Sequence, residues 1–278
     1  MKKTIFLIVI LGLIQLKIIG QTNAKSVLTN DAYLENPQLY LSKLDTHKVA
    51  SRILIDRVAF DDLVFNLNGN DKVSSINASD FQKVYTQLEA ASYDSIRFRT
   101  PEKINGFVAN QYALNRIVAM SLMDFSFNSI KQTALDSGQL LEATDFLQDN
   151  NATKNSFDTH RLIATTCNAG NITGDNFQFQ LNKFLFLTNN YKQKLNTIEV
   201  DFGNGDGYRP INFDELVNVS YNDNSEYIEI KVKLTFENYR DKETEILYAH
   251  TNLYKTGSST VPMLYNANTT ISYKPELD

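Results

Sequence analysis

Strict alternation of apolar and polar residues in the last third of the chain is the feature that most constrains its fold. Ile228, Ile230, Val232, Leu234 and Phe236 alternate with charged residues or threonine. Successive side chains of a β-strand point to opposite faces, so this pattern predicts a strand with one buried and one wet face. The same period recurs near residues 177–187, 198–202, 217–221 and 247–253. Such strands, separated by Asn, Gly and Asp turns, predict an antiparallel β-sandwich.

One of these strands is expected over residues 177–187. Its apolar residues are predicted to share a single face: Phe177, Phe179, Leu181, Leu185 and Leu187. Polar residues fill the positions between the first three, which places them toward water in this interpretation.

The preceding part, residues 25–170, has a mixed pattern that predicts an α+β region. Ser79 to Gln82 has the spacing of a capping box, and Phe81 to Leu88 continues at helical intervals, so a helix is expected there. Residues 117–127 are apolar at both alternating sets of positions. This pattern fits a strand buried on both faces, and a buried helix fits nearly as well.

The N-terminus has the pattern of a secretory signal peptide. Lys2 and Lys3 precede an apolar run that ends before Lys17, and small or polar residues follow. The run is shorter than the roughly 20 residues of a membrane-spanning helix, although an uncleaved anchor is the alternative. Cleavage is expected after Gly20 or after Ala24. The sequence therefore predicts a secreted or cell-surface protein with no transmembrane span after cleavage.

Charge and cysteine content narrow the partners and the means of stabilisation. The net charge of −5 argues against a nucleic-acid partner, because phosphate binding needs clustered Lys and Arg. The single cysteine, Cys167, excludes an internal disulfide, so an exported domain must rest on its core. We expect Cys167 to be a buried, inert thiol. The hydrophobic content of 42% is sufficient for such a core.

A short motif in the alternating part resembles a known family. Val200-Asp201-Phe202-Gly203-Asn204-Gly205 is similar to the Trp-Asp-Phe-Gly-Asp-Gly signature of PKD (polycystic kidney disease) domains, which are extracellular β-sandwich modules of secreted bacterial proteins. Tyr221 and Tyr227 flank a short turn before the alternating strand, as in that family. The resemblance covers about residues 172–258, and the layout also resembles secreted proteins of the Bacteroidota.

The sequence departs from the PKD pattern at three positions. Val200 replaces the Trp, Asn204 replaces an Asp, and Ser225 stands where Gly is usual. With this resemblance the expected organisation is a signal peptide (1–24), an α+β N-terminal domain (25–170), a PKD/immunoglobulin-like antiparallel β-sandwich (171–260) and a C-terminal extension (261–278).

Candidate binding residues cluster after the PKD-like motif. They are Asp201, Asn204, Asp206 and Tyr208. Gly203, Gly205 and Gly207 permit a left-handed turn there, and Asp201 is placed to accept hydrogen bonds from its backbone N–H groups. A structural calcium ion at Asp201, Asn204 and Asp206 is an alternative, but calcium loops need more carboxylates, so we expect no metal and no cofactor. Tyr208, Tyr239 and Tyr254 are candidate aromatic contacts for carbohydrate, and packing in the core or at its rim is the favoured interpretation of each.

Catalytic signatures are missing from the sequence. It contains no His-Glu-x-x-His, no Gly-x-Ser-x-Gly and no phosphate-binding loop. His47 and His160 lie in identical Asp-Thr-His tripeptides, and the two would form a metal or hydrolytic centre only if they met in space. A hydrolase in residues 25–170 that uses His160 is therefore a minor alternative.

The combined observations favour a non-catalytic exported protein. Its PKD-like module would serve as a spacer, as an adhesion module, or as a domain that binds an extracellular glycan or protein. The alternative is the N-terminal accessory region of a larger secreted hydrolase, which a reading frame that continues beyond Asp278 into a hydrolase domain would favour.

Overall fold

A computed structural model describes residues 26–94, 98–150, 155–168, 174–222 and 227–254. The predicted signal peptide (1–24), the expected extension (261–278) and Ser225 lie outside the described residues. No helix within these described ranges is long and apolar enough to cross a membrane.

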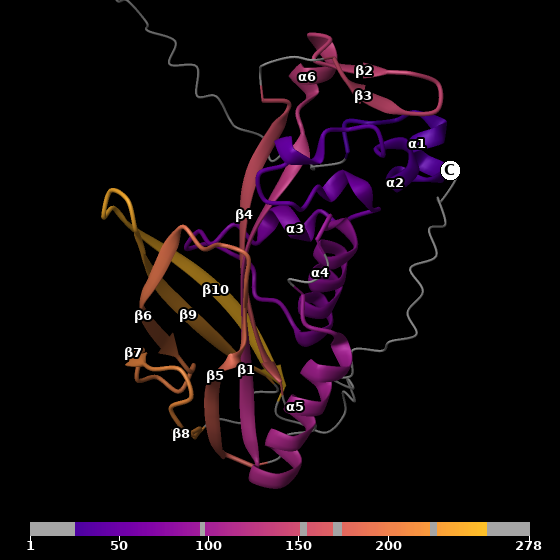
Figure 1. The fold of residues 1–278 in the computed structure, drawn as a ribbon. Helices are drawn as coiled ribbons and strands as arrows, with labels where there is room; N and C mark the ends of the chain where they lie inside the picture. Colours follow the sequence, from indigo (N-terminus) through magenta and orange to yellow (C-terminus); the bar gives the residue numbers. More distant parts are fainter. Residues whose placement is uncertain (1–25, 95–97, 151–154, 169–173, 223–226, 255–278) are drawn as a thin grey trace, which may run out of the picture.

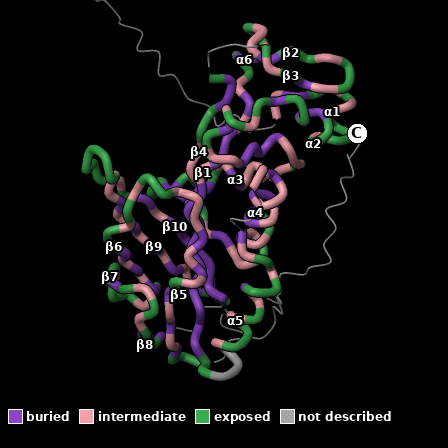
Figure 2. The backbone as a smooth tube through the Cα atoms, viewed as in Figure 1, coloured by how far each residue is buried: buried purple, intermediate pink, exposed green. Residues whose placement is uncertain are grey.

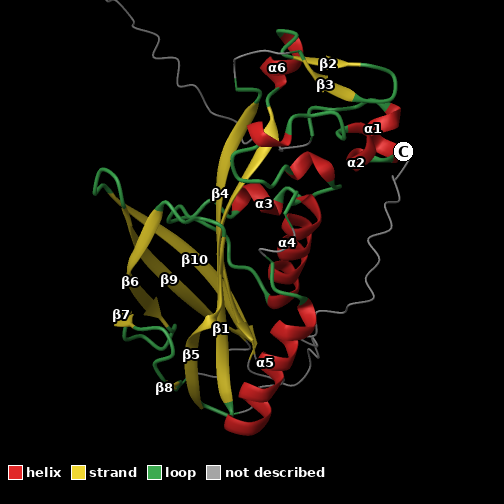
Figure 3. Cartoon of the chain, in the orientation of Figure 1, coloured by secondary structure: helices red, strands yellow, loops and turns green. Residues whose placement is uncertain are grey.

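Short helices dominate the first part of the chain (Figure 3). The α-helices are α1 (Asp31–Glu35), α2 (Pro37–Tyr40), α3 (Leu63–Asn66), α4 (Ala78–Ala91), α5 (Pro101–Asn115) and α6 (Gln132–Asp136), and the 3-10 helices are η1 (Thr46–Lys48) and η2 (Ile55–Arg57). Figure 1 shows α4 and α5 running one after the other along the same side of the long strands. Residues 25–170, which the sequence predicts to be α+β, therefore contain helices before residue 117 and strands after it.

Strands make up most of the remainder. They are β1 (Ile117–Ile130), β2 (Leu140–Glu142), β3 (Leu147–Asp149), β4 (Phe157–Asn168), β5 (Asn176–Thr188), β6 (Gln193–Asp201), β7 (Tyr208–Ile211), β8 (Val217–Ser220), β9 (Tyr227–Asn238) and β10 (Thr244–Tyr254). The first sheet has the order β4-β1-β5-β8 and the second sheet β10-β9-β6-β7, while β2 and β3 form a separate hairpin. All pairings are antiparallel except that of β1 with β5.

Strand β1 is the centre of the molecule and is buried on both faces along most of its length (Figure 2). Its even-numbered residues Val118, Met120 and Leu122 share a core with the second sheet. Odd-numbered residues, among them Met123 and Phe125, pack instead in a core with α4 and α5. Of the two interpretations of residues 117–127, the strand buried on both faces is confirmed.

The division expected at residue 170 falls within one continuous sheet. Strands β1 and β4 precede it, yet β1 pairs with β5, which follows it. A second connection is the segment 67–76, which lies along the edges of both sheets. Its Leu67 carbonyl accepts from Ile163 of β4 at 2.8 Å, and its Gly69 carbonyl accepts from Tyr248 of β10 at 2.8 Å. The helical region and the second sheet are thus joined through shared strands and through this segment.

Helix α4 begins two residues earlier than its sequence suggests. The capping box is formed by Asn77 and Asp80, where the Asn77 side chain accepts from the Asp80 backbone and the Asp80 side chain accepts from the Asn77 backbone. The prediction that Ser79 and Gln82 form the box was wrong, because asparagine caps as well as serine and occupies the earlier position.

Strand β5 does not present all of its apolar residues on one face. Met120 pairs with Leu181, but Leu122 pairs with Phe186, so β5 contains an irregularity that reverses the facing of its later residues. Phe177, Phe179 and Leu181 consequently face the second sheet, while Leu185 and Leu187 face the helices. The single-face prediction was wrong for this strand, because period two holds only where pairing is regular.

A buried ion pair within the first sheet holds an arginine that also contacts the second sheet. Arg161 of β4 donates from Nε to Asp124 Oδ1 of β1 at 2.9 Å and from Nη2 to Asp124 Oδ2 at 3.2 Å, with the Asp124 side chain only 1% exposed. The same guanidinium contacts Gln193 of β6 and Glu245 of β10, and it lies 4.3 Å from the ring centre of Phe236. Arg161 therefore reaches from the first sheet to three strands of the second.

A second buried carboxylate, Asp56, organises the N-terminal end. Its Oδ1 accepts from the Ser26 hydroxyl at 2.8 Å and its Oδ2 accepts from the Ile130 backbone at 2.8 Å. The Tyr33 hydroxyl donates to the backbone carbonyl oxygen of Asp56 at 2.9 Å. Burial raises the pKa of the Asp56 carboxyl to about 6, although the hydrogen bonds from Ile130 and Ser26 oppose the shift.

The Asp124–Arg161 pair predicts a large stability effect. Asp124→Ala should lower the free energy of unfolding by about 3 kcal/mol, because it leaves the partly buried Arg161 charge without its bidentate partner. Urea denaturation measures this loss. The double change Asp124→Leu with Arg161→Met should recover much of it, since both charges are then removed. Lys233→Ala, which breaks the solvent-accessible pair of Lys233 with Glu199, is the control and should cost much less than Asp124→Ala. Equal losses for Asp124→Ala and Lys233→Ala would contradict the assignment.

Asp56 predicts a distinct pH dependence. The pKa of Asp56 is about 6 in the folded chain, whereas the ordinary value of 3.8 applies in the unfolded chain. At pH values between the two, the folded state therefore binds more protons than the unfolded state. Its contribution to stability therefore increases as the pH falls from about 6 to about 4 and is unfavourable at pH 7. Asp56→Asn should remove this contribution, which is about 2–3 kcal/mol. The control Asp71→Asn removes an exposed carboxylate and should be as stable as the wild type at both pH values. Unfolding of the three proteins at pH 4.5 and pH 7 provides the comparison, and identical pH profiles for wild type and Asp56→Asn would refute it.

Candidate functional site

The outward face of the second sheet brings charged and aromatic side chains into one row. Tyr208 of β7 pairs with Asp201 of β6, Asp201 pairs with Lys231 of β9, and Lys231 pairs with His250 of β10. Their sequence neighbours Val200 and Val232 are fully buried in the core between the sheets, so the row points away from that core. We call this surface the outer face, and it includes Glu229, Tyr227 and Tyr254 as described below.

Glu229 is the charged centre of the outer face. Lys231 Nζ lies 3.2 Å from its Oε2, His250 Nδ1 lies 3.6 Å from its Oε1, and the Ser75 hydroxyl donates to Oε1. Burial raises the pKa of the Glu229 carboxyl, but the hydrogen bonds from Ser75 and Lys231 outweigh it and hold the pKa below its usual range. Partial burial lowers the pKa of His250, although the charge of Glu229 opposes this. At neutral pH, Glu229 is therefore ionised and His250 is neutral.

Tyrosines flank this charged centre. Tyr227 and Tyr254 are cross-strand partners at one end of β9 and β10, with ring centres 6.3 Å apart. They are 54% and 43% exposed, and Tyr208 is 39% exposed. Burial, followed by the charge of Asp201, raises the pKa of Tyr208, so its hydroxyl stays protonated and is a hydrogen-bond donor. The outer face thus combines exposed aromatic rings with acceptors and donors for hydrogen bonds.

The turn after β6 has the left-handed geometry expected from its glycines. Gly203, Gly205 and Gly207 have φ values of 72°, 93° and 74°. A Cβ at Gly203 would lie 2.5 Å from the Glu229 carbonyl oxygen, so glycine is needed for the turn to approach β9. Asp201 Oδ1 accepts from the Gly203 backbone at 2.9 Å, as its position suggested.

Asn204 and Asp206 lie at the tip of this turn and bind each other. The Asn204 side-chain amide donates to Asp206 Oδ2 at 2.6 Å. Asn204 lies in the turn between β6 and β7 and is not part of the row on the sheet. The structure thus brings Asp201 and Tyr208 together with Lys231 and His250, and it leaves Asn204 and Asp206 beyond the end of that row. Within the described ranges no group of three or more His, Cys, Asp or Glu side chains is arranged to hold a metal ion.

Tyr221 fixes the turn to the end of β8. Its hydroxyl donates to the Phe202 carbonyl at 2.7 Å in a buried position, and its backbone N–H donates to the Asp175 carbonyl at 2.8 Å. The Tyr221 ring packs in the core between the sheets, where Phe202 also lies. The hydroxyl of Tyr221 therefore stabilises the backbone at Phe202, where the chain enters the turn.

The histidines of the Asp-Thr-His tripeptides occupy unrelated environments. His47 is exposed in η1, where Asp45 accepts from its backbone N–H at 3.0 Å. His160 packs between Phe65 and Phe127, with both ring centres 5.0 Å away, and its Nε2 lies 2.8 Å from the Ser129 hydroxyl. Burial lowers the pKa of His160. No hydrogen bond or ring contact joins His47 to His160 in the part of the chain that the structure describes.

Cys167 is buried in the core between the sheets, and burial raises the pKa of its thiol. Because the thiolate is the reactive form, this cysteine is inert, as expected.

Four members of the outer face were missed by sequence reasoning: Ser75, Glu229, Lys231 and His250. Glu229 and Lys231 were identified as the wet side of a strand, but their row partners depend on strand order. Ser75 comes from the distant segment 67–76 and has no sequence signal that links it to Glu229. Tyr254 was a candidate aromatic contact and lies on the face, whereas Tyr239 lies beyond the opposite end of β9.

Comparison with known proteins provides no relative. No protein-family model matches the chain, and neither a curated protein nor a solved structure is significantly similar to it.

Tyr221→Phe should destabilise the chain by about 1–3 kcal/mol, because the buried Phe202 carbonyl then loses its hydrogen-bond donor. Tyr239→Phe is the matched control, because Tyr239 is 56% exposed and its hydroxyl is free to bind water. Urea denaturation of both variants measures the difference. A Tyr221→Phe protein as stable as Tyr239→Phe would show that the hydroxyl does not hold the turn.

Proposed function

We propose that this chain is an exported, non-catalytic binding protein, and that its residues 171–260 supply the PKD-like part of a β-sandwich, completed by β1 and β4, which binds an extracellular glycan on the outer face. The observation that carries the proposal is the row Tyr208–Asp201–Lys231–His250 beside Glu229 and the exposed pair of tyrosines. The sandwich assignment draws support from the core shared by the two four-stranded sheets. The fixed turn at Phe202 and Tyr221 supports the resemblance to PKD modules.

The chemistry of the outer face suits sugar rings. A pyranose presents an apolar C–H face, which packs on an aromatic ring, and a rim of hydroxyl groups that need both donors and acceptors. Tyr227, Tyr254 and Tyr208 supply exposed rings, Glu229 and Asp201 supply acceptors, and Lys231 supplies a donor. Exposed tyrosines with few side-chain torsions give contact area at low entropic cost. An open sheet face also suits an extended polymer better than an enclosed small molecule.

The polar centre of the outer face is arranged for binding rather than for nucleophilic catalysis. A serine nucleophile needs its hydroxyl hydrogen-bonded to a general base such as histidine. The Ser75 hydroxyl donates instead to Glu229, whose pKa is depressed, and a carboxylate of low pKa is a weak base. His250 Nδ1 faces the same Glu229 oxygen, Oε1, that accepts from Ser75, so both side chains are directed at the carboxylate.

Export is consistent with how this chain is stabilised. The sequence begins with the pattern of a signal peptide, and its single cysteine is buried and inert. Three hydrophobic cores and the buried Asp124–Arg161 pair stabilise the described part instead of disulfides.

A glycan array probed with the full chain tests the proposal. We expect binding to a restricted set of polysaccharides, with affinity reduced about tenfold or more in Tyr227→Ala and in Glu229→Gln, because single anchors of this kind contribute more than about 1 kcal/mol. Tyr239→Ala removes an exposed tyrosine outside the face and should bind as wild type. An array on which the full chain binds nothing would refute the glycan proposal and leave the spacer role. Equal loss in Tyr239→Ala would assign binding to another surface.

A further inference from the structure

Asparagine is followed by glycine at three places in the chain, Asn68-Gly69, Asn105-Gly106 and Asn204-Gly205. An asparagine side chain can react with the backbone nitrogen of the next residue, and glycine has no Cβ to hinder this approach. The reaction needs a free nitrogen and a backbone that can change its conformation. The fold therefore decides which of the three pairs can react.

Asn204-Gly205 lies at the tip of the turn between β6 and β7, where Gly205 is exposed. A Cβ at Gly205 would meet no atom within 4 Å, and within the described ranges no hydrogen bond engages the Gly205 N–H. The Asn204 side chain is held at both amide atoms by Asp206. Its Oδ1 accepts from the Asp206 backbone at 3.4 Å, and its Nδ2 donates to Asp206 Oδ2 at 2.6 Å. These contacts fold the side chain back toward the Gly205 peptide, whose nitrogen stays free.

Asn68-Gly69 has a similar local contact but a fixed backbone. Asn68 Oδ1 accepts from the Asn70 backbone at 3.1 Å, as Asn204 Oδ1 does from Asp206. The carbonyls of Leu67 and Gly69 accept hydrogen bonds from β4 and β10, each at 2.8 Å, and Gly69 is buried. Asn68 is therefore a matched control within the same molecule, because it has the same dipeptide and side-chain contact without the freedom of the backbone.

Asn105-Gly106 lies within helix α5, Pro101–Asn115. The backbone N–H groups inside an α-helix donate to the carbonyls four residues earlier, so the Gly106 nitrogen is engaged. Reaction at Asn105 would need local unfolding of the helix.

From these three environments we propose that Asn204 is a site of spontaneous deamidation in the folded protein. A base removes the Gly205 N–H proton, the nitrogen attacks the side-chain carbonyl carbon of Asn204, and ammonia leaves as a succinimide ring closes. Water then opens the ring at either carbonyl carbon. One opening gives aspartate, and the other gives isoaspartate, in which the chain runs through the side-chain carboxyl. The net reaction consumes water, releases ammonia and involves no oxidation, and it does not depend on glycan binding.

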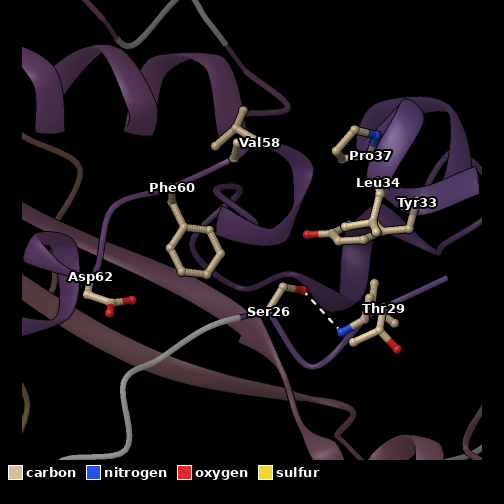
Figure 4. Close-up of a pocket in the computed structure, with 10 residues that line it drawn as sticks. Ser26, Thr29, Tyr33, Leu34, Pro37, Val58, Phe60 and Asp62 are labelled. Atoms are coloured by element: carbon tan, nitrogen blue, oxygen red, sulfur yellow. Dashed lines mark hydrogen bonds between the residues drawn. The ribbon is translucent and has the colours of Figure 1, made fainter. Parts of the chain in front are cut away.

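The products change the turn beside the outer face. Both place a new carboxylate close to Asp206, and isoaspartate also lengthens the main chain of a turn that approaches β9 closely at Gly203. The change should remain local. The pocket of about 320 Å³ between Tyr33 and Phe60, which Figure 4 shows, is lined only by residues within the range 26–62 and shares none with the turn.

Incubation of the full folded chain in mildly alkaline buffer, followed by peptide mapping with mass spectrometry, tests the site. Asn204 should be converted at least about tenfold faster than Asn68 and Asn105. In urea the three rates should become similar, because each asparagine is followed by glycine and none is held by the fold. The rate at Asn204 should also rise with pH, because the attacking nitrogen must lose its proton.

Asn204→Gln is the matched variant, because it keeps the amide but would need a larger ring for the same attack. On ion exchange the wild type should develop more acidic species during incubation, and Asn204→Gln should develop far less of them. Three results would overturn the proposal: no conversion of Asn204 in the folded chain, conversion of Asn68 at a rate comparable to Asn204, or a rate at Asn204 that does not change with pH. The comparison of the three asparagines uses the wild type, so it holds even if Asn204→Gln fails to fold.

Discussion

The Arg161 guanidinium is the interaction on which the arrangement of the two sheets depends. It is held by both oxygens of Asp124 within the first sheet, and from there it reaches Gln193, Glu245 and the ring of Phe236 in the second. Apolar packing alone permits sheets to slide against each other, because the hydrophobic effect is non-directional. A buried charge has few positions in which its hydrogen bonds are satisfied, and removing either partner leaves a large penalty. The contacts of Arg161 with Gln193 and Glu245 therefore favour one relative position of the sheets.

With the two sheets in this relative position, neither face of β1 is exposed to solvent along most of the strand. Its even-numbered side chains complete the core with the second sheet, and its odd-numbered side chains complete the core with α4 and α5. The two cores share one backbone, so neither the helices nor the second sheet can be removed without exposing apolar surface of β1. The segment 67–76 strengthens this dependence, because its backbone hydrogen bonds join it to β4 and β10.

The same segment links the helical region to the outer face. It carries Ser75, whose hydroxyl donates to Glu229 and helps to keep the pKa of that carboxyl low. A residue from the first third of the chain therefore sets the charge of a surface built by the last third.

The sequence by itself determined the strands of the last third, the burial of both faces of residues 117–127, the left-handed turn at Gly203 and the inert character of Cys167, because each follows from local periodicity or residue chemistry. It placed Asp201 and Tyr208 among the candidate site residues for the same reason. Only the tertiary structure decided that Lys231, His250 and Ser75 join them, since strand order and the path of segment 67–76 are not encoded in any local pattern. The reversal of facing within β5 and the Asp124–Arg161 pair were likewise out of reach, because each depends on contacts between residues far apart in the chain.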